Sequence, residues 1–322
     1  MGFLFAIPAA IAAFFARLGI IRSGALLAGL AFSGVLLISL VLGVSNTLSN
    51  PPPATAESEF HLEPRHLALA SNGPFGKFDR QQLQRGFQVY KEVCSACHSL
   101  KLVAFRDLKD LGYQEAEVKA IANQWSTEVP SINPETGEPA TRKATPSDAF
   151  PSPYANETAA RAGNNNALPP DLSLITKARE GGAAYVHSLL TGYRNQPADL
   201  LKKFPTAKTP ANLHYNPYFA NLNLAMPPPL ISAGQVTYAP GNPPPTVEQM
   251  ATDVAAFLVW TAEPKLENRH RWGVVAAMFL LFASVLAYFA YQQVWAEAKR
   301  KTAPTITRAP AVKAKTRKAK AK

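Results

Sequence analysis

Hydrophobic and polar positions divide the chain into two long apolar stretches, one near each end, with a mixed segment between them. Residues 272–296 contain no charge over 25 positions, which is enough for a helix to cross a hydrocarbon core. A tryptophan stands at each end of this stretch, as is typical of membrane interfaces. Residues 24–44 form the second stretch and follow Arg17 and Arg22, an order typical of an export signal. The small residues 54–56 offer a cleavage site, and a retained membrane anchor is the alternative.

Between these stretches the pattern favours helices, because strict alternation of apolar and polar residues is sparse. Residues 79–94 predict a helix that Asp79 can cap, with Gln82 in the capping-box position. One face of this helix is apolar and carries Leu83, Phe87, Tyr90 and Cys94.

The last helix before the C-terminal apolar stretch is predicted over residues 246–262. Thr246 and Gln249 stand at the two positions of a capping box, and apolar residues recur along one face. A shorter helix is predicted over residues 183–191. The mixed segment is therefore expected to be mostly helical with long loops.

The charge of the chain is concentrated in its C-terminal tail. The 33 Lys and Arg residues exceed the 22 Asp and Glu residues, for a net charge of +11. Residues 299–322 hold 10 basic residues and no acidic one, whereas residues 23–298 hold 21 basic and 22 acidic residues. A nucleic-acid interface needs its basic residues on the folded part, so we expect no nucleic-acid partner. The tail is either a solvated extension or a segment that binds anionic membrane lipid.

The same charges predict how the chain crosses a membrane. The positive-inside rule leaves the N-terminus and the basic tail in the cytoplasm and exports residues 57–268. The first 22 residues are too apolar and too poor in Arg and Ser for a mitochondrial transit peptide, which favours a bacterial origin.

The only two cysteines, Cys94 and Cys97, lie three positions apart and are followed by His98. A thioredoxin-like dithiol needs a helix that begins at the first cysteine, but here the predicted helix ends there. Zinc needs four ligands, and the other histidines show no pairing at zinc-finger spacing. A covalent haem needs two thiols for its vinyl groups and an adjacent histidine for its iron, and all three are present. A disulfide between the two would close only a very small, strained loop. We favour one covalent haem c, with the dithiol and zinc as alternatives.

The second axial ligand is sought among the four methionines. Met1 begins the chain, Met278 lies in the apolar C-terminal stretch, and Met250 falls on the apolar face of a capped helix. Met226 precedes three prolines, in a segment that cannot form a helix and can hold a thioether over a haem. We predict Met226 as the ligand, with His214 as the alternative.

Haem propionates are anions that need cationic or hydroxyl donors. The segment that follows residue 171 supplies Lys177, Arg179, Tyr185 and Tyr193. We predict Arg179 with Tyr185 at a propionate, and a solvated surface arginine is the alternative.

These residues lie in blocks that together resemble the cytochrome c1 family, the haem subunits of cytochrome bc1 complexes. The blocks are RGFQVYKEVCSACHSL, ALPPDLSLITKAREGGAAYVHSLLTGY, HYNPYFANLNLAMPPPL and MATDVAAFLVWTAEPKLENR, and they span roughly residues 73–300. The resemblance implies an all-α, class I cytochrome c-like haem domain with long loops and one C-terminal transmembrane helix. It also implies thioether bonds at Cys94 and Cys97, axial ligation by His98 and Met226, and a propionate near Arg179 and Tyr185.

Four parts are then expected along the chain. They are a signal or N-terminal membrane segment (1–56), a periplasmic haem domain (57–268), a transmembrane anchor (269–298) and a basic cytoplasmic tail (299–322). The resemblance implies electron transport in a respiratory chain: one electron at a time from the Rieske iron–sulfur protein to a soluble or membrane-tethered cytochrome c. Cytochrome b and membrane lipid are the other expected partners, the complex is expected to be dimeric, and catalysis is expected only within it.

Two departures from the family pattern change the picture. The chain has no cysteines for the extra disulfide of some bacterial members, and no charge follows Met226 before Glu248. Since acids soon after this methionine help to attract a basic cytochrome c, we expect weaker electrostatic steering. Two other functions are alternatives: a membrane-anchored cytochrome c that serves another oxidase or reductase, and an exported thiol–disulfide oxidoreductase.

Overall fold

The computed structural model describes residues 19–51 and 53–302, over which the chain is mostly helical, as predicted. Two parts of the sequence prediction, the start of the signal segment (1–18) and most of the basic tail (303–322), lie outside the described residues. The helices are α2 (Ile20–Ser49), α3 (Ala56–Phe60), α4 (Arg80–Val89), a π-helical turn (Tyr90–Cys94), two 3-10 turns (Phe105–Leu111 and Pro205–Ala207), α5 (Glu115–Asn123), α6 (Glu157–Gly163), α7 (Ile175–Ala178), α8 (Gly182–Thr191), α9 (Ala198–Lys203), α10 (Val247–Ala262) and α11 (Leu266–Thr302). The strands form two antiparallel pairs, β1 (Val129–Ile132) with β2 (Pro139–Arg142) and β3 (His214–Tyr215) with β4 (Asn223–Leu224).

The chain divides into two units, of which the smaller joins the segment up to His61 with Pro197–Lys208. Within it the rings of Phe60 and Phe204 meet edge to face at 6.4 Å. The larger unit, Leu62–Gln196 with Thr209 onward, contains the predicted haem-binding residues.

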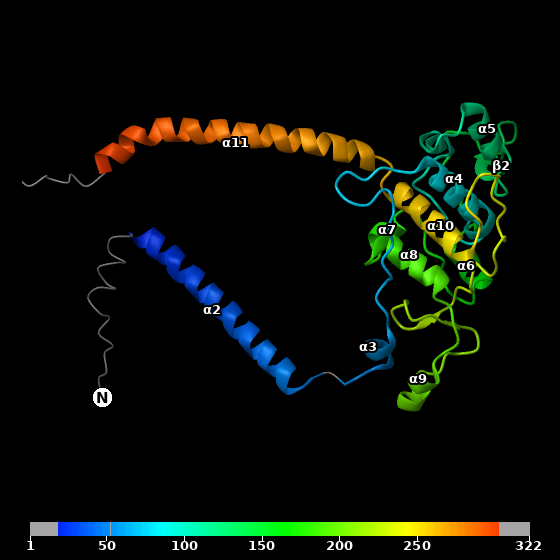
Figure 1. The fold of residues 1–322 in the computed structure, drawn as a ribbon, viewed down its shortest axis with the longest axis horizontal. Coiled ribbons are helices and arrows are strands. Elements are labelled where there is room, and N and C mark those ends of the chain that lie inside the picture. The colour runs from blue at the N-terminus through cyan, green and yellow to red at the C-terminus, as the bar shows by residue number, and fades with distance from the viewer. Residues whose placement is uncertain (1–18, 52, 303–322) are drawn as a thin grey trace, which may run out of the picture. The chain divides into compact units, whose positions relative to one another are not determined.

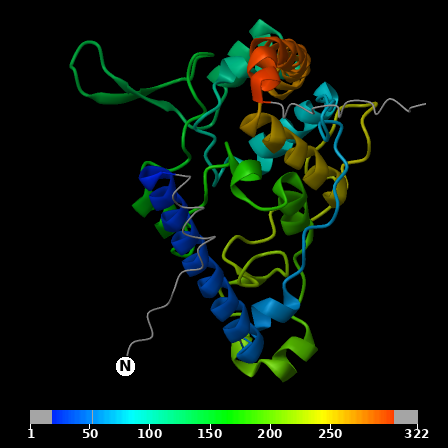
Figure 2. The same ribbon diagram turned by 90° about the vertical axis from the view of Figure 1, so that its left-hand side faces the viewer.

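The centre of the larger unit is the crossing of α4 and α10, with α8 packed on the other side of α10 (Figures 1 and 2). The two helix backbones meet at Gly86, where a Cβ would lie only 2.1 Å from the carbonyl oxygen of Asp253. Aromatic rings surround this contact and form the core, namely Phe87, Tyr90, Phe105, Trp125, Phe150, Phe257 and Trp260. The crossing fixes the direction in which α4 delivers the residues that follow it.

The three helices predicted for the mixed segment are confirmed, with one difference in their caps. Asp79 accepts from the backbone N–H groups of residues 81 and 82, and Thr246 accepts from the N–H of Gln249. The side chains of Gln82 and Gln249 do not return to these caps. Both donate instead to the same oxygen of Asp253, at 3.2 and 2.9 Å. Each predicted capping box is therefore only half formed.

Asp253 is fully buried on α10 and forms an ion pair with Arg85 of α4. Oδ2 lies 2.9 Å from Nε and Oδ1 lies 3.1 Å from Nη2, while Nη1 donates to Asn242. The Arg85 guanidinium also lies over the ring of Tyr238, 5.8 Å from its centroid. Burial alone would lower the pKa of Arg85, but its bond to Asp253 and that charge outweigh burial and raise it. This pair ties the two crossing helices together.

A second polar contact joins α8 to the start of α10. His187 is buried on α8, and its Nε2 lies 3.0 Å from Oε1 of Glu248. Arg65 also approaches Glu248 at 3.9 Å, bonds to the hydroxyl of Thr191 and donates its backbone N–H to Ser188. Burial is the main reason that the pKa of His187 is lowered, and Arg65 adds to the effect while Glu248 opposes it.

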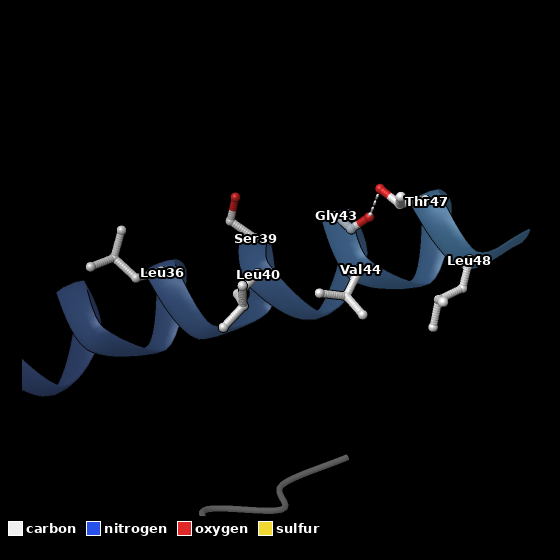
Figure 3. Close-up of a pocket in the computed structure, with 7 residues that line it drawn as sticks. All are labelled: Leu36, Ser39, Leu40, Gly43, Val44, Thr47 and Leu48. Carbon is white, nitrogen blue, oxygen red and sulfur yellow. Dashed lines mark hydrogen bonds between the residues drawn. The ribbon is translucent and has the colours of Figure 1, made fainter. Parts of the chain in front are cut away.

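Two helices are long and apolar enough to cross a membrane: Ile21–Ser49 of α2 and Leu266–Glu297 of α11, with mean hydropathies of 2.5 and 2.3. The apolar side chains of α2, and those of α11 from Trp272 onward, are largely exposed. Figure 3 shows one face of α2, a shallow groove lined by Leu36, Ser39, Leu40, Gly43, Val44, Thr47 and Leu48. The only side-chain bond there runs from the Thr47 hydroxyl to the Gly43 carbonyl, so the groove offers an apolar surface and no reactive group.

Candidate functional site

The segment from Cys94 to His98 begins at the end of the π-helical turn that continues α4. The backbone N–H of Ser95 donates to the carbonyl of Tyr90 at 2.8 Å, and the N–H groups of Cys97 and His98 both donate to the carbonyl of Cys94. The helix thus ends at the first cysteine, as predicted, and the chain curls so that both thiols and the imidazole leave one tight turn. Such π-helical turns are frequent at functional sites.

The imidazole of His98 is fixed by a backbone carbonyl. Its Nδ1 lies 2.8 Å from the carbonyl oxygen of Pro170. A carbonyl only accepts, so Nδ1 carries the proton and Nε2 keeps its lone pair for a metal. Burial lowers the pKa of His98, against the smaller opposing effects of Pro170 and Asp171, and this favours the neutral ring that a metal requires.

A row of hydrogen bonds holds the His98 and Pro170 segments side by side. Asp171 accepts from the hydroxyl of Ser99 at 2.8 Å, from the N–H of Lys101 at 2.9 Å and from the N–H of Ser173 at 2.9 Å. Burial alone would raise the pKa of Asp171, but these bonds outweigh it and lower the pKa. The ionised carboxylate therefore clamps the segment that orients the histidine.

The surroundings of the cysteines do not resemble those of a catalytic dithiol. Burial raises the pKa of Cys94 to about 12, whereas reactive dithiols have a lowered pKa at a helix N-terminus. The hydroxyl of Tyr154 lies 3.9 Å from the Cys97 sulfur and accepts from Asn164 at 2.9 Å. Neither cysteine forms a disulfide, and both residues are half-buried.

Met226 belongs to a loop, here called the methionine loop (residues 223–235), that begins with β4. The hydroxyl of Tyr193, just beyond α8, donates to the carbonyl of Met226 at 3.0 Å. Gln235 closes the loop, because it accepts from the N–H of Ile231 and donates to the carbonyl of Pro229. Met226 is thus carried by a braced backbone with its side chain partly exposed.

His214, the alternative ligand, comes from the same region. It lies in β3 opposite Leu224, and its ring packs edge-on against Tyr193, with centroids 6.4 Å apart. Buried Asn216 supports the turn between the strands by donating to the carbonyl of Leu189 in α8. Both candidate ligands are therefore positioned by α8 and the residues that follow it.

Arg179 and Tyr185 meet at the junction of α7 and α8. Burial raises the pKa of Tyr185, and the adjacent Arg179 guanidinium partly opposes that rise. Tyr185 in turn lies near Tyr193, whose pKa is raised mainly by burial and further by Tyr185. Arg179, Tyr185 and Tyr193 therefore lie in one region of the domain, and Tyr193 bonds to the carbonyl of Met226. The hydroxyl of Tyr193, one of the predicted propionate donors, donates to the methionine loop.

Other functional residues were not apparent from sequence patterns. Pro170, Asp171, Tyr154 and Asn164 support His98 and Cys97, yet they belong to long loops without periodicity. Their only signal is that Pro170 and Asp171 fall in a block that the family resemblance includes. No hydrogen bond or ion pair among the described residues joins the His98 side of the site to the Met226 side.

The donor set suits a covalent haem. It consists of two free thiols on one turn, a neutral imidazole with Nε2 available, and a thioether on a braced loop. Zinc needs four ligands, but nowhere in residues 19–51 and 53–302 do three or more His, Cys, Asp or Glu side chains gather at a metal-binding distance.

Comparison with known proteins agrees with this chemistry. The family model described as Cytochrome C1 family matches residues 69–298. The chain is 41% identical over 269 residues to a mitochondrial cytochrome c1 heme protein of Arabidopsis thaliana, covering 83% of this chain and 84% of that protein. It is 41% identical over 241 residues to cytochrome c1 of Rhodospirillum rubrum, covering 70% and 85%.

A third relative is the cytochrome b/c1 of Bradyrhizobium diazoefficiens, which is 45% identical over 240 residues. The aligned part covers 70% of this chain but only 34% of that longer protein. The family match, the cysteine–histidine turn and the braced methionine loop lead to one assignment: the chain belongs to the cytochrome c1 family.

Proposed function

We propose that the chain is the haem-bearing electron-transfer subunit of a quinol–cytochrome c oxidoreductase and assembles with a cytochrome b. The family match over residues 69–298 supports this, as does the name of the Bradyrhizobium relative, which joins a cytochrome b to a c1. The single observation that carries the proposal is the His98 imidazole, whose Nδ1 is bound by the carbonyl of Pro170 next to two cysteines that form no disulfide.

Within this function, Cys94 and Cys97 would form the thioethers, and His98 and Met226 would take the two axial positions of one haem c. When bound, the haem supplies reversible one-electron transfer, and a methionine ligand raises its reduction potential. The protein's part is to keep the His98 ring neutral and oriented and to hold the methionine loop in place. Arg179 and Tyr185 would lie near a propionate, where a cation and a hydroxyl offset its charge.

The axial assignment is tested by comparing Met226→Leu with His214→Phe in the haem-loaded full chain. If Met226 is the ligand, its replacement removes the sulfur-to-iron charge-transfer band and lowers the midpoint potential, while His214→Phe retains both. A band that is absent from the unsubstituted chain, with a haem spectrum and midpoint potential that change in His214→Phe but not in Met226→Leu, would assign the ligand to His214 instead.

The electron donor is proposed to be a Rieske iron–sulfur protein and the acceptor a cytochrome c, within a dimeric complex. Purification of an affinity-tagged chain from its membrane tests this assignment. Cytochrome b and a Rieske protein should co-purify, and the complex should reduce cytochrome c with quinol. A haem-loaded chain that instead co-purifies with a different oxidase or reductase would support the membrane-anchored donor alternative.

Several acidic residues that could attract a basic cytochrome c are paired with cations of the same chain. Glu115 pairs with Lys119 at 3.1 Å and Lys109 at 3.4 Å, and Glu128 pairs with Lys143 at 3.4 Å. Glu248 is likewise engaged, next to His187 and Arg65. We therefore predict that the rate of cytochrome c reduction depends only weakly on ionic strength. A steep fall in this rate with added salt would contradict the prediction.

We further propose that α11 anchors the chain in a bacterial inner membrane, with residues 57–268 in the periplasm and residues 299–322 in the cytoplasm. Residues 1–56 would be a signal segment. Ala56 is buried as the first residue of α3, and Thr55 caps that helix, so a peptidase would have to cut after Ala56 before α3 folds. The sequence of the mature N-terminus tests this: Glu57 supports removal, and an intact N-terminus supports a retained anchor.

A further inference from the structure

A loop ahead of α4 lies beside the first turns of α11. This loop, residues 71–77, is here called the Phe75 loop. Figure 1 shows it in light blue, projecting next to the start of α11. Its carbonyl at Gly76 lies 3.2 Å from Nδ1 of His270, two residues before Trp272 and the uncharged run of α11. The tip of the loop is therefore close to the level at which α11 becomes continuously apolar.

The position of the loop is fixed at its C-terminal end by a carboxylate. Glu267 of α11 accepts from the backbone N–H of Phe78 at 2.8 Å and from the Arg80 guanidinium at 2.9 Å. Leu266, one residue earlier, is buried against the domain. The loop and the beginning of α11 thus form one connected structure.

The loop is also braced internally. A Cβ at Gly76 would lie 2.2 Å from the carbonyl oxygen of Ser71, so only glycine fits this close approach. The N–H of Lys77 donates to the carbonyl of Ala70 at 2.9 Å, which closes the base of the loop. A braced loop can hold a side chain outward without a large entropy cost when that side chain is bound.

Phe75 is the side chain that this loop presents, and 76% of it is exposed. Trp272 of α11 is also exposed, at 65%. The cations Lys77 and Arg271 are exposed nearby in the sequence, one in the loop and one beside the tryptophan. Aromatic rings flanked by cations are typical of the headgroup region, where the rings meet acyl chains and the cations meet phosphates.

We propose that the Phe75 loop is a second membrane contact of this chain, in which Phe75 enters the phospholipid interface next to Trp272. The partner is the headgroup–acyl boundary of the bilayer that α11 crosses, which peripheral anchors enter by about 5–10 Å. With two contacts, the haem domain could not rotate freely about the stalk. The proposal rests on the membrane crossing proposed for α11, and it adds a site in the exported domain to which no role has been given.

Fluorescence quenching of a labelled thiol tests the proposal in the purified complex, reconstituted in phosphatidylcholine–phosphatidylglycerol nanodiscs. Cys94 and Cys97 are expected to be held by haem, so a polarity-sensitive label can be placed on Phe75→Cys, with the unsubstituted complex as background. Ile132→Cys is the matched control, since Ile132 is an exposed apolar residue (68%) on the β1–β2 hairpin. Met278→Cys, in the uncharged run of α11, reports the membrane crossing itself. Pro74→Cys, which keeps Phe75, is the second test position if Phe75→Cys does not assemble.

A nitroxide-bearing lipid should quench the label at position 75 at least about twofold more than at position 132, and aqueous iodide should show the reverse order. Iodide quenching at position 75 equal to that at position 132 would overturn the proposal. Protection from both quenchers would also overturn it, because another subunit would then cover the loop. Lipid quenching at position 278 but not at position 75 would overturn the contact proposed for the Phe75 loop and leave the membrane crossing of α11 standing. No lipid quenching at either position would refute the membrane crossing of α11 as well.

Discussion

The crossing of α4 and α10 predicts a large effect for the smallest substitution at its centre, Gly86→Ala. The added Cβ would lie 2.1 Å from the Asp253 carbonyl oxygen and 2.7 Å from Cβ of Phe257, whereas ordinary contacts begin at 3.4 Å. Both atoms belong to helix backbone or are attached directly to it, so no change of side-chain rotamer can relieve the overlap. The two helices must move apart instead.

The magnitude follows from two opposing terms. Alanine in place of glycine inside a helix normally stabilises it by about 1 kcal/mol. Overpacking a rigid core costs about 3 kcal/mol at the upper end of its usual range, which is appropriate for a clash with backbone. The net loss is then about 2 kcal/mol, and a unit of this size should melt about 4–8 °C lower.

Thermal unfolding of the haem-loaded full chain in detergent, followed by circular dichroism, measures this change. Gly273→Ala is the matched control, because Gly273 lies inside α11 and has no atom within 4 Å of a built Cβ. We expect the melting temperature to fall for Gly86→Ala and to stay constant or rise slightly for Gly273→Ala. An unchanged or higher melting temperature for Gly86→Ala would refute the close crossing on which the fold description depends.

Three further predictions concern polar groups outside the crossing. Asp253→Ala leaves the Arg85 charge buried without its partner and should lower the free energy of unfolding, measured with denaturant, by about 3–5 kcal/mol. Adding Arg85→Leu to the same chain should restore most of this loss, and no recovery would contradict the ion pair. Tyr193→Phe removes the hydrogen bond to the Met226 carbonyl, which is worth about 1 kcal/mol. In a spectral titration, added imidazole should therefore replace the methionine with an affinity about fivefold higher than in the unsubstituted chain. An unchanged imidazole affinity would show that Tyr193 does not brace the methionine loop. The folded pKa of His187 lies below its unfolded value near 6.5, so the unfolded chain binds more protons and stability should fall as pH drops through about 6.5. The loss between pH 7 and pH 5 should be smaller in His187→Phe, and parallel losses would contradict this origin.

The helices of the domain could be predicted because their signals are local. Asp79 and Thr246 cap α4 and α10 with bonds to residues two or three positions away, and the apolar stripe of each helix is visible in its own sequence. The uncharged run of α11 is equally local. The helices α4, α10 and α11 can thus be predicted from their own residues, without knowledge of what they pack against.

What could not be predicted depends on partners far away in the chain. Carboxylates are seldom fully buried, and the burial of Asp253 is explained only by Arg85 and Gln82, which approach it from α4. The π-helical turn before Cys94 requires the packing of Tyr90 in the core and shows no sequence signal. Pro170 acts on His98 through a backbone carbonyl, which any residue type could supply.

The candidate site shows the same division. The thiols and the imidazole could be proposed from three positions of sequence, because their chemistry lies in side chains at fixed spacing. Their support could not, since Asp171 and Tyr193 act across 70 and 33 residues of chain. The structure therefore identifies the residues that support the haem-binding side chains, whereas the haem-binding side chains themselves could be predicted from the sequence.

The central claim is that Cys94 and Cys97 attach a haem whose iron is bound by His98. The most direct test is acid–acetone extraction of the denatured chain purified from its membrane, followed by a reduced-minus-oxidised visible spectrum of the protein pellet. We expect the haem to stay with the polypeptide and to show the α-band of a thioether-linked haem, and we expect Cys94→Ala with Cys97→Ala to release it. Haem in the acetone phase of the unsubstituted chain, or a pellet with two titratable thiols and no α-band, would contradict it.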